Sequence, residues 1–147
     1  MKITLKESDY KRILEHALKE RPDEACGLIA GDEADGIRNI KEVYLLTNID
    51  HTNEHFSIDP REQLAAIKDI RSKGLKPLGN WHSHPESPSR PSEEDKRLAN
   101  DSNASYLILS LEKENEPVLN AFHVEGAIGE RTVRKEELII ISEDSAS

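Results

Sequence analysis

Only two stretches of this chain carry apolar residues at helical spacing over several turns, and this pattern constrains its fold more than any other feature. They are Tyr10–Leu18 and Leu64–Ile70, and a short third helix is expected from Ser92 to Asp101. The other apolar segments are short, as strands are, and several follow one another directly: Lys2–Leu5, Asp23–Gly31, Ile37–Leu46, Pro77–Trp81, Tyr106–Leu111, Pro117–Val124 and Glu137–Ile141. We therefore predict a mixed α/β domain of the α+β kind, in which two longer helices cover one curved sheet.

Length and charge limit the architecture and the partners. In 147 residues without a repeat or a linker, we expect one domain over residues 1–141 and a disordered tail over residues 142–147. The formal net charge is −9 at pH 7, which disfavours nucleic acid and anionic membranes as partners. No apolar run reaches the roughly 20 residues of a membrane span. The single cysteine, Cys26, excludes an internal disulfide and fits a reducing cytoplasm.

Two histidines lie at the end of the strand predicted to begin at Pro77. His82 and His84 are two positions apart, so their side chains project from the same face of a strand. Two imidazoles on one face can grip zinc. Prolines in Pro85–Pro91 then force a loop, and Asp95 follows at a predicted helix start. Asp95 could return as a third ligand, which would leave one coordination position open, as in catalytic zinc sites.

Each of these polar residues also has a purely structural explanation. The histidine pair could form a polar strand edge, Ser92 could be a helix N-cap, and Asp95 could complete a capping box with Ser92. Hydrolysis at a metal further needs a general base, usually a glutamate. Spacing alone does not choose among the candidates, which are Glu24, Glu86, Glu93 and Glu94.

Taken together, the residues resemble the motif of the JAMM (MPN+) metallopeptidases. That motif is a distant glutamate, then H-x-H, seven residues, a serine, two residues and an aspartate. Glu24, His82-Ser83-His84, Ser92 and Asp95 match every position. The segments Asp23–Leu28 and Phe56–Pro60 are also similar to family sequences, and the resemblance extends over roughly Leu5–Ile141.

The resemblance implies a role for each of these residues. His82, His84 and Asp95 would bind one zinc ion, with water as the fourth ligand. Glu24 would hold that water and act as general base, and Ser92 would hydrogen-bond the oxyanion. The family fold is a curved, mostly antiparallel sheet flanked by helices, with the short helix at the metal site, and is related to that of the cytidine deaminases.

The resemblance also implies a substrate class. The family cleaves amide or isopeptide bonds after the C-terminal glycines of ubiquitin-like proteins. The segments between His84 and Asp95 and between Ser110 and Pro117 leave no room for large insertions. The chain thus resembles compact stand-alone prokaryotic members, associated with ThiS- and MoaD-type sulfur carriers. We expect hydrolysis after the Gly-Gly tail of such a carrier.

Two alternatives and one property stay open at this stage. One alternative is an isopeptidase that removes a ubiquitin-like modifier from protein lysines. The other is a non-catalytic MPN scaffold, a class that typically lacks the metal ligands. The sequence does not indicate an oligomeric state.

Overall fold

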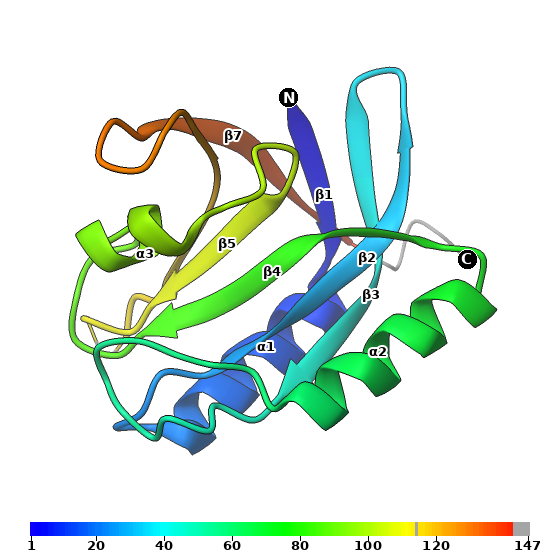
Figure 1. Ribbon diagram of the computed structural model, residues 1–147. Helices are drawn as coiled ribbons and strands as arrows, with labels where there is room; N and C mark the ends of the chain where they lie inside the picture. Colours follow the sequence, from blue (N-terminus) through cyan, green and yellow to red (C-terminus); the bar gives the residue numbers. More distant parts are fainter. Residues whose placement is uncertain (114, 143–147) are drawn as a thin grey trace.

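A computed structural model describes residues 1–113 and 115–142 (Figure 1). Over these residues the chain forms strands and helices in the following order: β1 (Lys2–Lys6), α1 (Glu7–Glu20), β2 (Cys26–Ala34), β3 (Ile37–Leu46), α2 (Pro60–Ser72), β4 (Lys76–His84), α3 (Glu93–Leu98), β5 (Ser105–Ser110), β6 (Val118–Glu125) and β7 (Thr132–Ile141). The predicted mixed α+β class, with two longer helices and one short helix, is confirmed.

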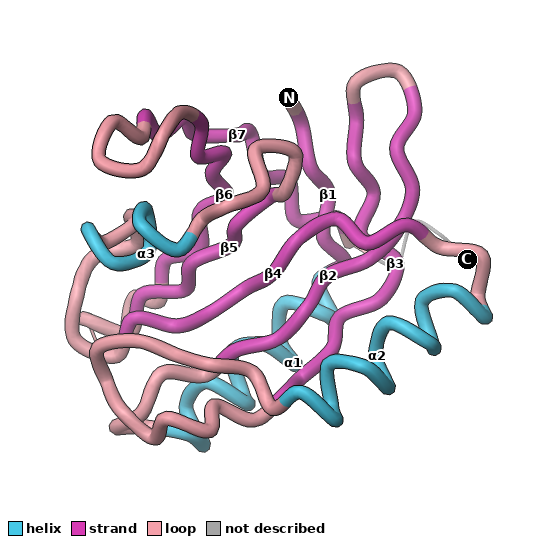
Figure 2. The backbone as a smooth tube through the Cα atoms, in the orientation of Figure 1, coloured by secondary structure: helices cyan, strands magenta, loops and turns pink. Residues whose placement is uncertain are grey.

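The strands form a closed barrel in the order β1-β3-β2-β4-β5-β6-β7 (Figure 2). Pairing is antiparallel for β2–β3, β2–β4, β5–β6 and β6–β7, and parallel for β1–β3, β4–β5 and β1–β7. The expected curved sheet is therefore closed into a barrel. It has four antiparallel and three parallel strand pairings, so it is only slightly more antiparallel than parallel. Closure occurs where β1 pairs with β7, which gives both would-be edge strands a partner for their backbone groups.

The core lies on the face of the barrel that points toward α1. Ile13 and Ala17 of α1 are fully buried there with side chains from most strands, such as Leu5, Trp81 and Leu107. Helix α2 packs against β2, β3 and β4. Strand β4 lies between β2, to which it is antiparallel, and β5, to which it is parallel, so it is held on both sides.

Local features at the element ends complete this description. Helix α1 begins at Glu7, and its N-cap residue, Lys6, makes no side-chain cap bond. The strand predicted over Glu137–Ile141 is the C-terminal half of a longer strand, β7, which begins at Thr132. Asp59 caps α2 and accepts a hydrogen bond from Arg61 N.

Two further expectations concern the C-terminal tail and the absence of a membrane-spanning helix. Most of the predicted disordered tail, residues 143–147, lies outside the described residues, and the domain boundary at residue 141 stays a prediction. Among the described residues, no helix has the length and apolar character needed to cross a membrane.

Candidate metal centre

Strand β4 places both motif histidines at its C-terminal end. His82 pairs with Cys26 of β2 and with Ile108 of β5, so the strand is hydrogen-bonded on both sides at this point. Trp81 anchors it from the core side, where the indole Nε1 donates to Tyr44 O at 3.0 Å. Because side chains alternate along a strand, His82 and His84 point away from the core together. Both are nonetheless buried, with 2% and 3% of their surface exposed.

Three potential ligand atoms converge beyond the end of this strand. The Nε2 atoms of His82 and His84 lie 3.1 Å apart. Asp95 Oδ2 lies 3.2 Å from the first and 3.0 Å from the second. The structure thus brings together the three residues that the sequence predicted as metal ligands, and within the described residues they are the group that could hold a metal ion.

Neighbouring groups orient the two imidazole rings. His84 Nδ1 lies 2.8 Å from Pro88 O, and a carbonyl only accepts, so Nδ1 carries the hydrogen and the Nε2 lone pair faces Asp95. The His82 ring stacks on Phe56, with centroids 4.8 Å apart and planes at 28°. A hydrogen bond from the other ring nitrogen, as in His84, commonly fixes the tautomer and the orientation of a ligating histidine.

Asp95 belongs to helix α3 and has two roles at once. Its Oδ2 accepts a hydrogen bond from Ser92 N at 2.9 Å, and its own N–H donates to Ser92 Oγ at 3.0 Å, which together form a capping box. Burial disfavours the charged carboxylate, but His82, His84 and the Ser92 N–H outweigh it and hold the pKa of Asp95 far below its ordinary value. The position of Asp95 is therefore compatible with both the capping role and the proposed ligand role.

The donor set fits a small divalent cation such as zinc. A tetrahedral zinc ion with bonds of about 2.0 Å has ligand atoms about 3.3 Å apart, close to the 3.0–3.2 Å observed among His82, His84 and Asp95. An anionic carboxylate beside two imidazole nitrogens favours a positive charge between them. The hydrogen bond with Asp95 raises the pKa of His84 above its ordinary value, although burial opposes that charge.

Glu24 lies just before β2 and is buried beside this cluster, with 3% of its surface exposed. Burial raises the pKa of its carboxyl to about 8; Asp95 and Glu94 raise it as well, while His84 lowers it. Its Oε1 has no hydrogen-bond partner within the described residues. A carboxyl with a pKa near neutrality and a free oxygen is suited to accept and return a proton.

Ser92 retains a hydrogen to donate. Its Oγ accepts from Asp95 N, and this bond uses an oxygen lone pair rather than the hydroxyl hydrogen. The hydroxyl is held beside Asp95 by the capping box at the start of α3. A helix N-terminus is also a favourable setting for developing negative charge.

Comparison with known families decides what kind of protein this is. Residues 6–124 match Prok-JAB, the prokaryotic homologs of the JAB domain. The chain belongs to this family. The predicted resemblance to the JAMM (MPN+) metallopeptidases is thereby confirmed.

Several proteins are similar to this Prok-JAB chain. It is 30% identical over 119 residues to the CysO-cysteine peptidase of Mycobacterium tuberculosis, which covers 80% of each protein. It is 33% identical over 103 residues to the desampylase of Haloferax volcanii, covering 67% of this chain and 73% of the other. The solution structure of a Desulfitobacterium hafniense protein matches with a TM-score of 0.86 and 47% identity over 96% of this chain and 94% of that one.

The sequence analysis assigned no role to three residues that build this Prok-JAB site. Ser83 is fully buried and links β4 to the Glu24 segment, because its Oγ accepts from Ala25 N at 2.8 Å. Phe56 stacks on His82, and Asn48 is buried behind Glu24. A signal existed for Asn48, since an Asn two residues before another turn former often accepts from the backbone ahead of it, as it does here from Asp50 N.

A cavity of about 200 Å³ lies next to the metal ligands. Its lining is mostly apolar and combines the strand face, helix α3 and the segment after β3: His55, Phe56, Asn80, His82, Pro91, Asp95, Leu98, Ala99, Tyr106, Ile108 and Val124. A cavity that includes two of the three candidate ligands has space for a substrate segment at the reacting centre.

Proposed function

We propose that this protein is a zinc-dependent metallopeptidase that hydrolyses the amide or isopeptide bond after the C-terminal Gly-Gly of a ubiquitin-like sulfur-carrier protein. The observation that carries this proposal is the convergence of two histidines and one aspartate beside a buried glutamate with a raised pKa. Its family and the names of its relatives identify the chain as a hydrolase.

In this proposal His82, His84 and Asp95 hold one zinc ion. When bound, zinc would polarise the substrate carbonyl and lower the pKa of a water molecule to about 7. The chain itself supplies the orientation of the ligands. Pro88 O and the Phe56 ring hold the imidazoles, and the capping box holds the aspartate.

Glu24 would act as the general base. Its burial keeps the carboxyl close to the pH at which it can both take a proton from the attacking water and give one to the leaving amine. Ser92 would donate its hydroxyl hydrogen to the oxyanion of the tetrahedral intermediate. Its position is supported by the hydrogen bond that Ser92 Oγ accepts from Asp95 N.

The substrate assignment rests on the relatives and on the compact loops. The relative from Mycobacterium tuberculosis is named for a cysteine linked to CysO, so release of a single amino acid from a carrier tail is one supported reaction. The Haloferax volcanii relative is named a desampylase, which supports the alternative of an isopeptidase that removes a ubiquitin-like modifier from protein lysines. We propose the first as the main activity, since the relative whose name supports it matches a larger share of this chain, 80% against 67%.

Two measurements test the proposed function. We expect about one zinc ion per chain after reconstitution, measured by mass spectrometry of the metal, and its loss in His84→Ala. With zinc present, a sulfur carrier bearing an amino acid after its Gly-Gly tail should lose that amino acid, while Glu24→Gln should bind zinc but leave the carrier intact. A zinc-loaded wild-type protein that cleaves neither this carrier nor a Gly-Gly isopeptide conjugate would refute the proposal and favour a scaffold.

We also propose that the protein works in the cytoplasm as one domain over residues 1–141. The cysteine content supports a reducing compartment, because a single cysteine cannot form an internal disulfide. That cysteine, Cys26, is fully buried within β2. The closed barrel supports one domain, since its first and last strands pair with each other.

A further inference from the structure

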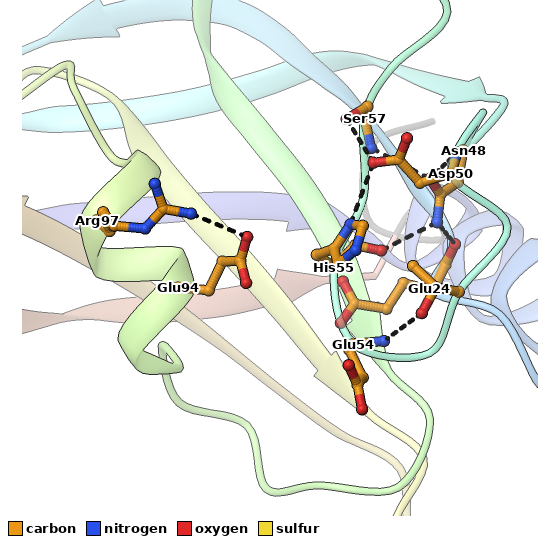
Figure 3. A network of polar contacts seen from close by, with 9 residues as sticks. Glu24, Asn48, Asp50, Glu54, His55, Ser57, Glu94 and Arg97 are labelled. Carbon is orange, nitrogen blue, oxygen red and sulfur yellow. Dashed lines mark hydrogen bonds and ion pairs between the residues drawn. The ribbon is translucent and has the colours of Figure 1, made fainter.

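The side chain of Asn48 is a buried hydrogen-bonding centre next to Glu24 (Figure 3). It lies between β3 and α2, with 5% of its surface exposed. Its Nδ2 donates to Glu24 O at 3.0 Å and to His55 O at 3.1 Å. Its Oδ1 accepts from Asp50 N at 3.0 Å and from Ser57 N at 3.1 Å.

These four bonds use the whole capacity of an asparagine amide, which has two donor hydrogens and one oxygen that accepts twice. An aspartate would turn an oxygen toward the two carbonyl groups of Glu24 and His55, and an aliphatic residue would leave all four backbone groups without this partner. The position thus requires an amide of this length. This hydrogen-bonding requirement is more specific than the volume requirement of a residue that only packs in the core.

The main chain of Glu24 is held entirely by its neighbours in this network. Glu24 N donates to Thr52 O at 2.8 Å, and Glu24 O accepts from Asn48. The next residue, Ala25, donates its N–H to Ser83 Oγ on the ligand strand. The side-chain Oε1 of Glu24 has no hydrogen-bond partner in the described part of the chain. The direction of the carboxyl therefore depends on how its main chain is held.

The same amide also holds the segment that carries Phe56. Asn48 bonds the residues on either side of it, His55 through the carbonyl and Ser57 through the N–H. The Phe56 ring stacks on His82. Asp50 reinforces the segment, since its Oδ2 lies 3.1 Å from His55 Nδ1 and accepts from Ser57 Oγ at 2.6 Å.

We propose that Asn48 is a positioning residue for hydrolysis: its amide holds the Glu24 main chain and the Phe56 segment in one arrangement, so that the general base and the His82 ring keep their places around the metal. This inference rests on the proposed function of Glu24. When the amide is lost, we expect the carboxyl of Glu24 to move relative to the ligands, while His82, His84 and Asp95 still bind zinc.

The test compares two Asn48 variants with a matched asparagine elsewhere. Asn48→Asp and Asn48→Ala should lower kcat by about tenfold or more, because small displacements of a catalytic group are costly, while KM and zinc content change by less than about threefold. Asn39 is the control: its side chain donates to Asp32 and accepts from Thr4 in β1. Asn39→Ala should lose these two side-chain bonds and retain wild-type kcat.

Hydrogen exchange of the zinc-free protein provides a second readout that needs no substrate. Asn48→Ala, which removes the acceptor of the Ser57 amide and the donor to Glu24 O, should speed exchange of the Glu24 and Ser57 amides by about tenfold or more, while the Leu107 amide in β5 stays protected. If kcat and these exchange rates both match those of the Asn39→Ala control, the positioning role is refuted. If the wild type is inactive but exchange changes as expected, the proposed function fails and the positioning of Glu24 by Asn48 stands.

Discussion

Glu24→Gln should stabilise the metal-free protein, and by an amount that depends on pH. Burial raises the pKa of this carboxyl from an ordinary value of 4.5 to about 8. Below pH 4.5 the group is neutral in the folded and the unfolded state. As the pH rises from 4.5 to 8, the unfolded chain loses the proton while the folded protein keeps it, so the wild type loses stability across this window. Glutamine does not titrate and avoids the loss.

The difference between the two pKa values sets the magnitude. At about 1.4 kcal/mol per pH unit, it corresponds to about 3 to 5 kcal/mol above pH 8. Urea unfolding in the presence of a chelator measures it, with the fluorescence of Trp81, the single tryptophan, as the probe. We expect Glu24→Gln to be more stable than the wild type by about this amount at pH 8.5 and by less than about 1 kcal/mol at pH 5.

The control is Glu15→Gln on the exposed side of α1, which should leave stability within about 0.5 kcal/mol at both pH values. Equal effects of Glu24→Gln at pH 5 and pH 8.5, or a loss of stability at pH 8.5, would refute the argument that Glu24 is an acid held at a cost in a buried site.

Three other outcomes follow from contacts at or near the site. Ser92→Ala should lower kcat by about 10²- to 10³-fold as an oxyanion donor and lower stability by about 1 kcal/mol as an N-cap; a loss of stability without a loss of kcat would restrict Ser92 to capping. Cys26 is buried with its pKa raised to about 12, so a thiol reagent at pH 8 should react in urea and not in the native protein, as followed by absorbance. Gly79→Ala should cost about 3 kcal/mol or more in urea unfolding, because an added Cβ would lie 1.9 Å from Ser105 O at a φ of +152°; a wild-type midpoint would contradict this close approach.

Local patterns in the sequence predicted part of the site and most of the elements. The placement of His82 and His84 on one face follows from the period of two in a strand, which needs no knowledge of the rest of the fold. The helix start at Ser92 and Asp95 is likewise a local capping signal. For these residues, the spacing along the chain is enough to predict which side chains lie close together in the structure.

Contacts between distant segments were beyond such reasoning. Spacing did not choose Glu24 from the other glutamates, because its burial depends on a segment about 25 residues away that contains Asn48. Only the family resemblance selected it. Closure of the barrel depends on β1 and β7 at opposite ends of the chain, and neither strand carries a local sign of its parallel partner.

The order of helix α3 should depend on whether a metal ion is bound. It has six residues and buries none of their side chains, whereas an isolated helix needs about 12–15 residues to persist in water. Its first turn is closed by Asp95, the same carboxylate that faces the two histidines. A cation bound there would link the helix to the barrel, and by reciprocity fraying of the helix would weaken the grip on the cation. The amides of α3 would then exchange more slowly when the metal ion is bound and faster when it is removed.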